Sequence, residues 1–80
     1  MYNLIYVKTA IEELYKNSPN IHISVDIPRP RVVVEKTNAV IIGVYRNFFQ
    51  IEEYSKGHPI RHTIQYGDVL IGHVVIEEIH

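Results

Sequence analysis

Apolar residues near the start of the chain recur at steps of three and four: Leu4, Val7, Ile11 and Leu14. This spacing places them on one face of an amphipathic helix. Asn3 can cap the helix by accepting a hydrogen bond from a backbone N–H of the first turn. Pro19 ends it, because the residue before a proline avoids helical angles. The pattern therefore predicts a helix over about residues 3–16.

After residue 20 apolar and polar residues alternate, which is typical of a half-buried strand. Four β-branched residues share one face of residues 21–27: Ile21, Ile23, Val25 and Ile27. Pro28 and Pro30 then break the strand, because proline has no backbone donor for the ladder. The break places two basic residues, Arg29 and Arg31, on an exposed connection.

Residues 32–36 resume an extended pattern, and Thr37 and Asn38 favour a turn or a bulge. The strand that follows is predicted to point three β-branched residues inward: Val40, Ile42 and Val44. Gly43 within it indicates a bend or a close approach of the backbone.

A turn at residues 46–47 leads into the next predicted strand. Phe49 and Ile51 are expected in the core, with Phe48 on the opposite face. Residues 55–59 then form a polar loop.

Residues 61–77 hold two alternating patterns that indicate the last two strands. Ile64 marks the core face of the first strand, and Val74 and Ile76 share a face of the second. Three residues between them are predicted to form a tight turn: Tyr66, Gly67 and Asp68. An isolated pair of strands is marginally stable, so the upstream elements must supply the rest of a core.

One helix followed by about five short antiparallel strands predicts a mainly β fold, a small SH3-like or Sm-like barrel over about residues 20–79. The 80 residues allow a single domain, 1–80. A ferredoxin-like sandwich is the rival fold, but it needs a second helix that the pattern does not show.

Composition narrows the function classes. Eight basic and nine acidic residues give a net charge of -1, which is not the basic balance typical of nucleic-acid binding. The chain has no cysteine, which excludes disulfides and thiolate zinc sites. We expect a cytoplasmic protein without a membrane segment, because no secretory leader and no run of about 20 apolar residues is present.

The run Tyr66-Gly67-Asp68-Val69-Leu70 is similar to a tyrosine, small residue, aspartate, valine, leucine run of the Veg family. The order of features before it also resembles these small bacterial proteins, which are called biofilm formation stimulators. The resemblance covers nearly the whole chain after residue 7. It implies a cytoplasmic, non-enzymatic regulator that influences biofilm genes in Gram-positive bacteria, and it brings no established ligand or active site.

Residues with catalytic or metal-binding chemistry are present but not grouped. Asp68 is predicted to bond nearby backbone N–H groups in its turn. Four histidines could be metal ligands, yet their spacing does not indicate a site: His22, His58, His62 and His73. We therefore expect no metal, no cofactor and no enzyme activity.

Two binding hypotheses follow. The preferred partner is another protein or a second copy of the chain, bound at the strand edges of residues 32–34 and 74–76, with Phe48 and Tyr54 as candidate hot spots. The alternative is RNA or single-stranded nucleic acid, bound at the turn of Arg29 and Arg31. Further cations could extend that basic surface: Lys36, Arg46, Lys56 and Arg61.

Overall fold

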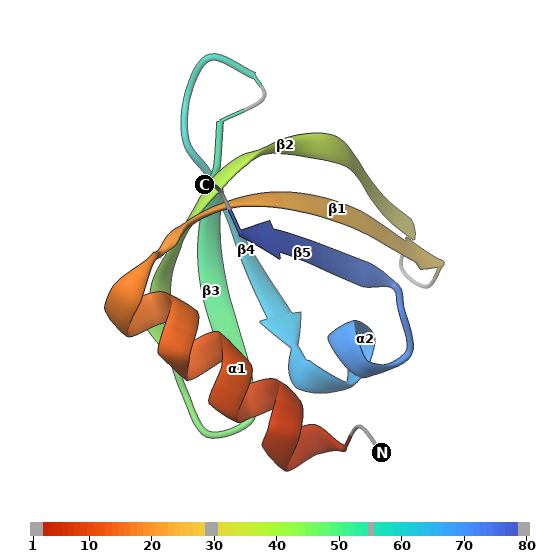
Figure 1. The fold of residues 1–80 in the computed structure, drawn as a ribbon. Coiled ribbons are helices and arrows are strands. Elements are labelled where there is room, and N and C mark those ends of the chain that lie inside the picture. Colours follow the sequence, from red (N-terminus) through yellow and green to blue (C-terminus); the bar gives the residue numbers. More distant parts are fainter. Residues whose placement is uncertain (1–2, 29–30, 55, 79–80) are drawn as a thin grey trace.

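The computed structural model describes residues 3–28, 31–54 and 56–78. The elements are, in order, α1 (Leu4–Asn17), β1 (Asn20–Pro28), β2 (Arg31–Val44), β3 (Phe48–Glu53), β4 (Ile60–Gln65), α2 (Tyr66–Leu70) and β5 (Val74–Glu78). The strands form one antiparallel sheet in the order β4-β3-β2-β1-β5 (Figure 1). This confirms the predicted mainly β fold, with five antiparallel strands behind an N-terminal helix.

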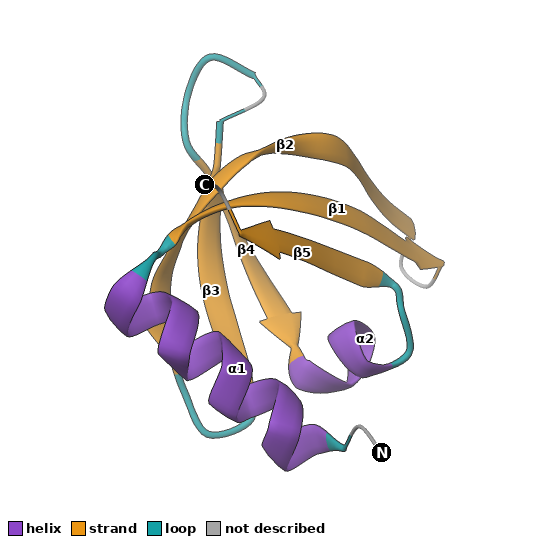
Figure 2. Ribbon diagram, viewed as in Figure 1, coloured by secondary structure: helices purple, strands orange, loops and turns teal. Residues whose placement is uncertain are grey.

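The sheet is curved but not closed. β4 and β5 are its two edges, and no backbone ladder joins them among the described residues. α1 and α2 lie next to each other at one end of the curved sheet (Figure 2). The predicted barrel is therefore open, and α1 and α2 lie where a ladder between β4 and β5 would close it.

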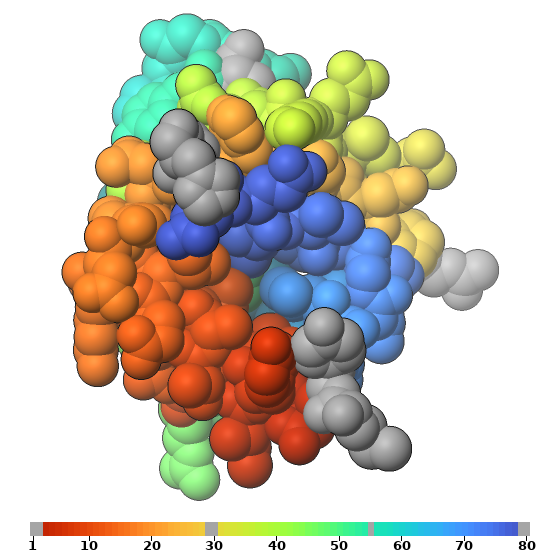
Figure 3. All heavy atoms as spheres, viewed as in Figure 1, coloured from red at the N-terminus to blue at the C-terminus, as the bar shows by residue number. Residues whose placement is uncertain are grey.

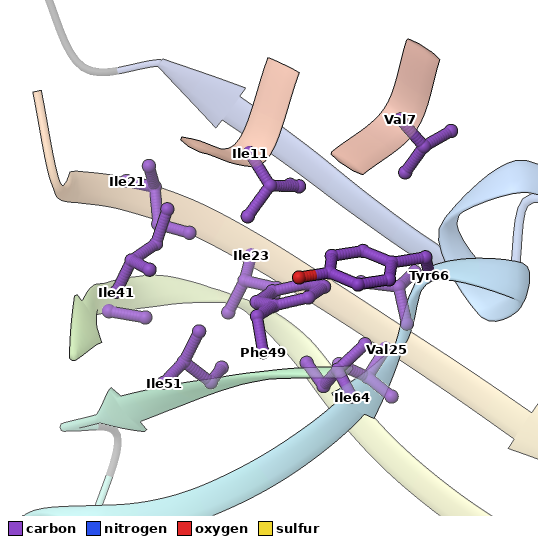
Figure 4. Close-up of a cluster of buried hydrophobic side chains, with 12 residues drawn as sticks. Val7, Ile11, Ile21, Ile23, Val25, Ile41, Phe49, Ile51, Ile64 and Tyr66 are labelled. Atoms are coloured by element: carbon purple, nitrogen blue, oxygen red, sulfur yellow. The ribbon is translucent and has the colours of Figure 1, made fainter. Parts of the chain in front are cut away.

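The core lies between α1 and the concave face of the sheet. Val7 and Ile11 point from α1 toward the rings of Phe49 and Tyr66, whose centroids are 5.6 Å apart (Figure 4). The strands complete the cluster with eight buried residues: Ile21, Ile23, Val25, Ala39, Ile41, Ile51, Ile64 and Val74. Fully burying a large apolar side chain contributes about 1.5–3 kcal/mol, so this cluster is the main source of stability.

The N-terminal helix forms where its pattern predicts. Oδ1 of Asn3 accepts a hydrogen bond from the N–H of Tyr6 at 2.8 Å, which caps the first turn. Ser18 leaves helical angles, and its N–H donates to the carbonyl oxygen of Leu14 at 2.8 Å. The helix ends at Asn17, one residue past the predicted end.

The turn predicted as one option at Thr37 and Asn38 is not formed, because β2 runs through both residues. The other option, a bulge, lies just before them. Ile23 of β1 pairs with Thr37, whereas Val25 pairs with Val34. Two residues of β2 therefore lie opposite the single residue between Ile23 and Val25, which defines a β-bulge and bends the strand.

The bulge decides which residues of β2 face the core, because one extra residue exchanges the two faces of a strand. Ala39 and Ile41 are buried, each 2% exposed. The inward orientation predicted for Val40 and Ile42 is therefore wrong, and both are half-buried. Val44 does pack against the core, because the register shifts a second time after Ile41.

The tight turn predicted at Tyr66, Gly67 and Asp68 is also wrong. These residues open α2, and a turn at residues 71–73 follows, with Gly72 at a φ of 88°. β4 and β5 are consequently not a hairpin, since β4 pairs with β3 and β5 pairs with β1. A helix of five residues is too short to show a helical period, so its apolar residues fit a strand pattern equally well.

α2 is a second helix, which the rival ferredoxin-like sandwich would also need. In this chain, however, the four consecutive strands β1 to β4 are antiparallel neighbours. The ferredoxin-like arrangement instead separates its first two strands by a helix. The core positions predicted for Phe49, Ile51 and Ile64 are confirmed, since all three are buried, and Val75 faces away from the core as its alternation with Val74 predicts.

Candidate functional site

Five large apolar side chains are exposed where α1 meets α2: Leu4, Ile5, Tyr6, Leu70 and Ile71. They are termed the apolar surface below. Ile5 is 77% exposed and Ile71 is 65% exposed, so most of each side chain is in contact with solvent. Single exposed apolar residues are common on proteins, but a group on α1, the end of α2 and the turn after it is typical of an interaction site.

A groove adjoins the apolar surface. It has a volume of about 330 Å³ and is lined by residues of α1, α2 and β5: Tyr6, Val7, Ala10, Ile11, Leu14, Val69, Leu70 and Ile76. Figure 3 shows the hollow where α1 (orange-red) meets β5 and α2 (blue). Its lining side chains are almost all apolar, so it can accept an apolar side chain of a partner.

β5 offers a backbone edge beside this groove. The N–H of Asp26 in β1 donates to the carbonyl oxygen of His73 at 2.7 Å, just before β5. Alternate residues of an antiparallel strand direct their backbone groups to opposite sides, so Val74 and Ile76 direct theirs away from β1. Among the described residues, no other element donates or accepts a hydrogen bond there. In Figure 1, β5 lies between β1 and the two helices.

The second predicted edge lies elsewhere on the molecule. β2 pairs with β3 only from Ala39 to Val44, so residues 32–34 have a strand partner on one side alone, β1. Val33 is 51% exposed there. Both predicted edges are thus edges of the sheet, but only the one on β5 lies beside the apolar surface.

The two predicted aromatic hot spots are not brought together. Phe48 is the first residue of β3, where it is half-buried with its ring centroid 5.0 Å from that of Tyr45. Tyr54 follows the last residue of β3 and is 43% exposed. They lie at opposite ends of one strand, so they do not form a joint contact.

The predicted basic residues are spread over the molecule. Arg29 lies outside the described residues, and Arg31 is exposed at the start of β2. Nζ of Lys36 is 3.1 Å from a carboxylate oxygen of Glu77, and Nη2 of Arg61 is 3.5 Å from one of Glu52. These pairs are largely exposed and add little stability, but each places a carboxylate beside the cation.

Arg46 has a different environment. It lies in the turn between β2 and β3, close to Lys8 and Lys16 of α1, and the three side chains line one hollow. Sequence reasoning missed the two lysines because α1 is far from Arg46 along the chain. Their proximity depends on how the helix crosses the sheet.

Two histidines each lie beside a carboxylate, which the spacing along the chain did not reveal. Nε2 of His62 is 3.4 Å from Oε1 of Glu53, whose side chain is 3% exposed. Nδ1 of His73 is 3.5 Å from Oδ1 of Asp68, across the turn after α2. Each contact is an ion pair only when the imidazole is protonated. The backbone hydrogen bonds predicted for the Asp68 side chain are not found in the described chain.

Tyr66 joins α2 to the turn that carries Arg46. Its hydroxyl donates to the carbonyl oxygen of Tyr45 at 2.6 Å. Burial raises the pKa of Tyr66 above its usual value of 10.0, and the nearby carboxylate of Glu12 raises that pKa further, whereas the hydrogen bond to Tyr45 lowers it. Tyr66 therefore stays a neutral donor at physiological pH, and it fixes the backbone beside Arg46.

Within residues 3–28, 31–54 and 56–78, no group of three or more histidine, aspartate or glutamate side chains is placed to hold a metal ion. Neither described helix has the length and apolar character needed to cross a membrane. In comparisons with known proteins, no family model and no curated protein matches the chain.

Proposed function

We propose that this chain is a non-enzymatic regulatory protein that acts by binding another protein through the apolar surface. The observation that carries the proposal is the exposure of five large apolar side chains, on α1, at the end of α2 and in the turn after it, beside an apolar groove. Such a surface gains free energy when a partner covers it, because apolar area leaves water.

The free edge of β5 favours a partner that places an extended segment beside the groove. β5 directs backbone donors and acceptors toward the groove side, and an added strand pairs with such an edge. The side chains of that segment would alternate between the groove and solvent. Hydrogen bonds along β5 then set its register, and the groove selects apolar residues.

The biological context of the proposal comes from the resemblance of residues 66–70 to the Veg family. This resemblance supports a contact made in the cytoplasm, in the regulation of biofilm genes. A partner in such a pathway would be a protein that controls gene expression. A second copy of the chain would use the same surface and is a separate outcome of the test.

A pull-down from cell lysate tests the proposal, performed with and without nuclease. The test variant combines Ile5→Glu with Ile71→Glu, which places two charges in the apolar surface. The control combines Val33→Glu with Tyr54→Glu, at exposed apolar residues away from α1 and α2. Both variants change the net charge equally, and thermal melting shows whether each is folded.

We expect the original chain and the control to capture the same protein after nuclease treatment. The test variant should capture at least about tenfold less, since hot-spot residues each contribute about 2 kcal/mol or more. Equal capture by both variants, or loss of the captured protein with nuclease, would contradict the proposal. A light-scattering mass above 9.3 kDa that the test variant abolishes would identify the partner as a second copy.

A further inference from the structure

A second surface lies on the other side of α1, against the turn between β2 and β3. A hollow of about 370 Å³ lies between α1 and this turn. It is lined by Lys8, Glu12, Tyr15 and Lys16 of α1, by Val44 at the end of β2, and by Tyr45 and Arg46 of the turn. Lys8 and Arg46 also line an adjoining hollow of about 470 Å³ beside α2, together with Leu4 and Ile5 at the start of α1. The two hollows together form a track along α1, with both cations at their boundary.

The track is positively charged on a chain of net charge -1. Lys8, Lys16 and Arg46 face a single carboxylate, that of Glu12. Among the described residues, none of these three cations forms an ion pair, whereas Lys36 and Arg61 each have a carboxylate partner. The charge of the track is therefore available to an anionic ligand.

Two exposed aromatic rings border the cations. Tyr15 is 42% exposed and Tyr45 is 47% exposed. A flat ring in contact with solvent is a stacking platform for an unpaired base. Cations interleaved with such rings suit a single nucleic-acid strand, which carries both phosphates and bases. A simple anion would contact the cations but not the rings.

The fold holds Tyr45 in place before any ligand arrives. Its N–H donates to the carbonyl oxygen of Phe48 at 2.9 Å, and its carbonyl oxygen accepts from Tyr66 at 2.6 Å. Its ring lies directly over Gly43, where a Cβ atom would be 2.6 Å from the tyrosine Oη. The glycine in this strand predicted such a close approach. Because the Tyr45 ring is already held in place, less conformational entropy is lost when a ligand binds to it.

We propose that this track binds single-stranded nucleic acid, with phosphates at Lys8, Lys16 and Arg46 and a base stacked on Tyr45. The site differs from the basic turn of Arg29 and Arg31 that the sequence suggested. The track borders the apolar surface, because Leu4 and Ile5 line its second hollow beside Lys8 and Arg46. Its proposed phosphate and base contacts use other residues, so it adds a ligand to the proposed regulatory protein.

Fluorescence anisotropy with a labelled 12-nucleotide oligo-dT tests the proposal at 50 mM salt and above. The test variant combines Lys8→Gln with Arg46→Gln. The control combines Arg31→Gln with Lys56→Gln, which removes the same charge from exposed residues outside the track. Thermal melting verifies that both variants fold.

We expect the original chain and the control to bind the oligonucleotide, and the test variant to bind at least tenfold more weakly. Up to three phosphate contacts predict that the logarithm of the affinity falls with the logarithm of salt with a slope of about -2. Absence of binding at 50 mM salt, or an equal loss in the control, would overturn the proposal. Tighter binding of the matching duplex would overturn it as well.

Tyr45→Leu separates stacking from charge, because it keeps both backbone hydrogen bonds of residue 45. A lost stack is worth about 1–3 kcal/mol, so oligonucleotide affinity should fall about fivefold or more. Affinity for inorganic polyphosphate, a ligand without bases, should stay unchanged. An equal effect on both ligands, or an effect on neither, would show that no base stacks on Tyr45.

Discussion

At the scale of single residues, the Tyr66 side chain packs in the core with its ring and holds a surface turn with its hydroxyl. Its ring stacks on Phe49 at 5.6 Å, and its hydroxyl reaches the carbonyl oxygen of Tyr45 at 2.6 Å. Sequence reasoning placed Tyr66 in a turn and gave it no buried role. The stack cannot be predicted from the chain, because Phe49 lies on β3, far from Tyr66 in sequence, and α2 sets the direction of the tyrosine ring.

Tyr66→Phe should lower the free energy of unfolding by about 0.5–1.5 kcal/mol at neutral pH. The variant keeps the ring and its stack but removes one hydrogen bond, and that range is the usual net contribution of such a bond. Urea unfolding followed by circular dichroism measures the difference. An unchanged free energy would show that the hydroxyl does not contribute to the fold.

The stability difference between the original chain and Tyr66→Phe should depend on pH. The pKa of Tyr66 is raised in the folded chain above the value of 10.0 for an unfolded one. Its contribution to stability is therefore fully present below pH 10 and is lost as the pH rises through the folded pKa. The difference between the original chain and Tyr66→Phe should shrink above pH 10. A difference that grows there would contradict the assigned direction of the pKa.

At the scale of elements, sequence reasoning succeeded where a pattern is local and long. α1 has four apolar residues at helical spacing and a capping residue, and β1 has four alternating β-branched residues. It failed for α2 and for the face of β2 that carries Val40 and Ile42. The bulge in β2 arises from pairing with β1, and the five residues of α2 are too few for a period.

Asn3→Ala should destabilise the chain by about 1 kcal/mol, because the N–H of Tyr6 loses the side-chain oxygen that accepts it at 2.8 Å. Asn3→Ser is the matched control, since serine caps a helix about as well as asparagine. Urea unfolding should place Asn3→Ser near the original chain. If both variants lost equal stability, the cap would not be the cause.

The candidate site, too, could be predicted only where it depends on a local pattern. The sequence predicted residues 74–76 as a free edge, because their alternating pattern is local. The apolar surface was not predicted, since it needs the contact between α1 and α2, and α2 itself was missed. Lys8 and Arg46 likewise meet only after α1 crosses the sheet.

At the scale of the whole molecule, the open sheet explains why both proposed binding surfaces lie along α1. The helices stand at the opening of the sheet, so α1 has one border with β5 and another with the turn between β2 and β3. The first border is apolar and suits a protein partner. The second is basic and aromatic and suits a nucleic acid. The two surfaces differ in chemistry and meet at the start of α1, where Leu4 and Ile5 line a hollow together with Lys8 and Arg46.

Site-specific photocrosslinking tests the central claim, binding of a protein at the apolar surface, most directly. The chain has no cysteine, so Ile5→Cys and Val33→Cys each give one attachment point for a thiol-reactive benzophenone. After irradiation in nuclease-treated lysate, we predict a covalent adduct with one defined protein from the variant labelled at residue 5 and none from that labelled at residue 33. An adduct with the same protein from residue 33 alone, or equally from both residues, would contradict the account.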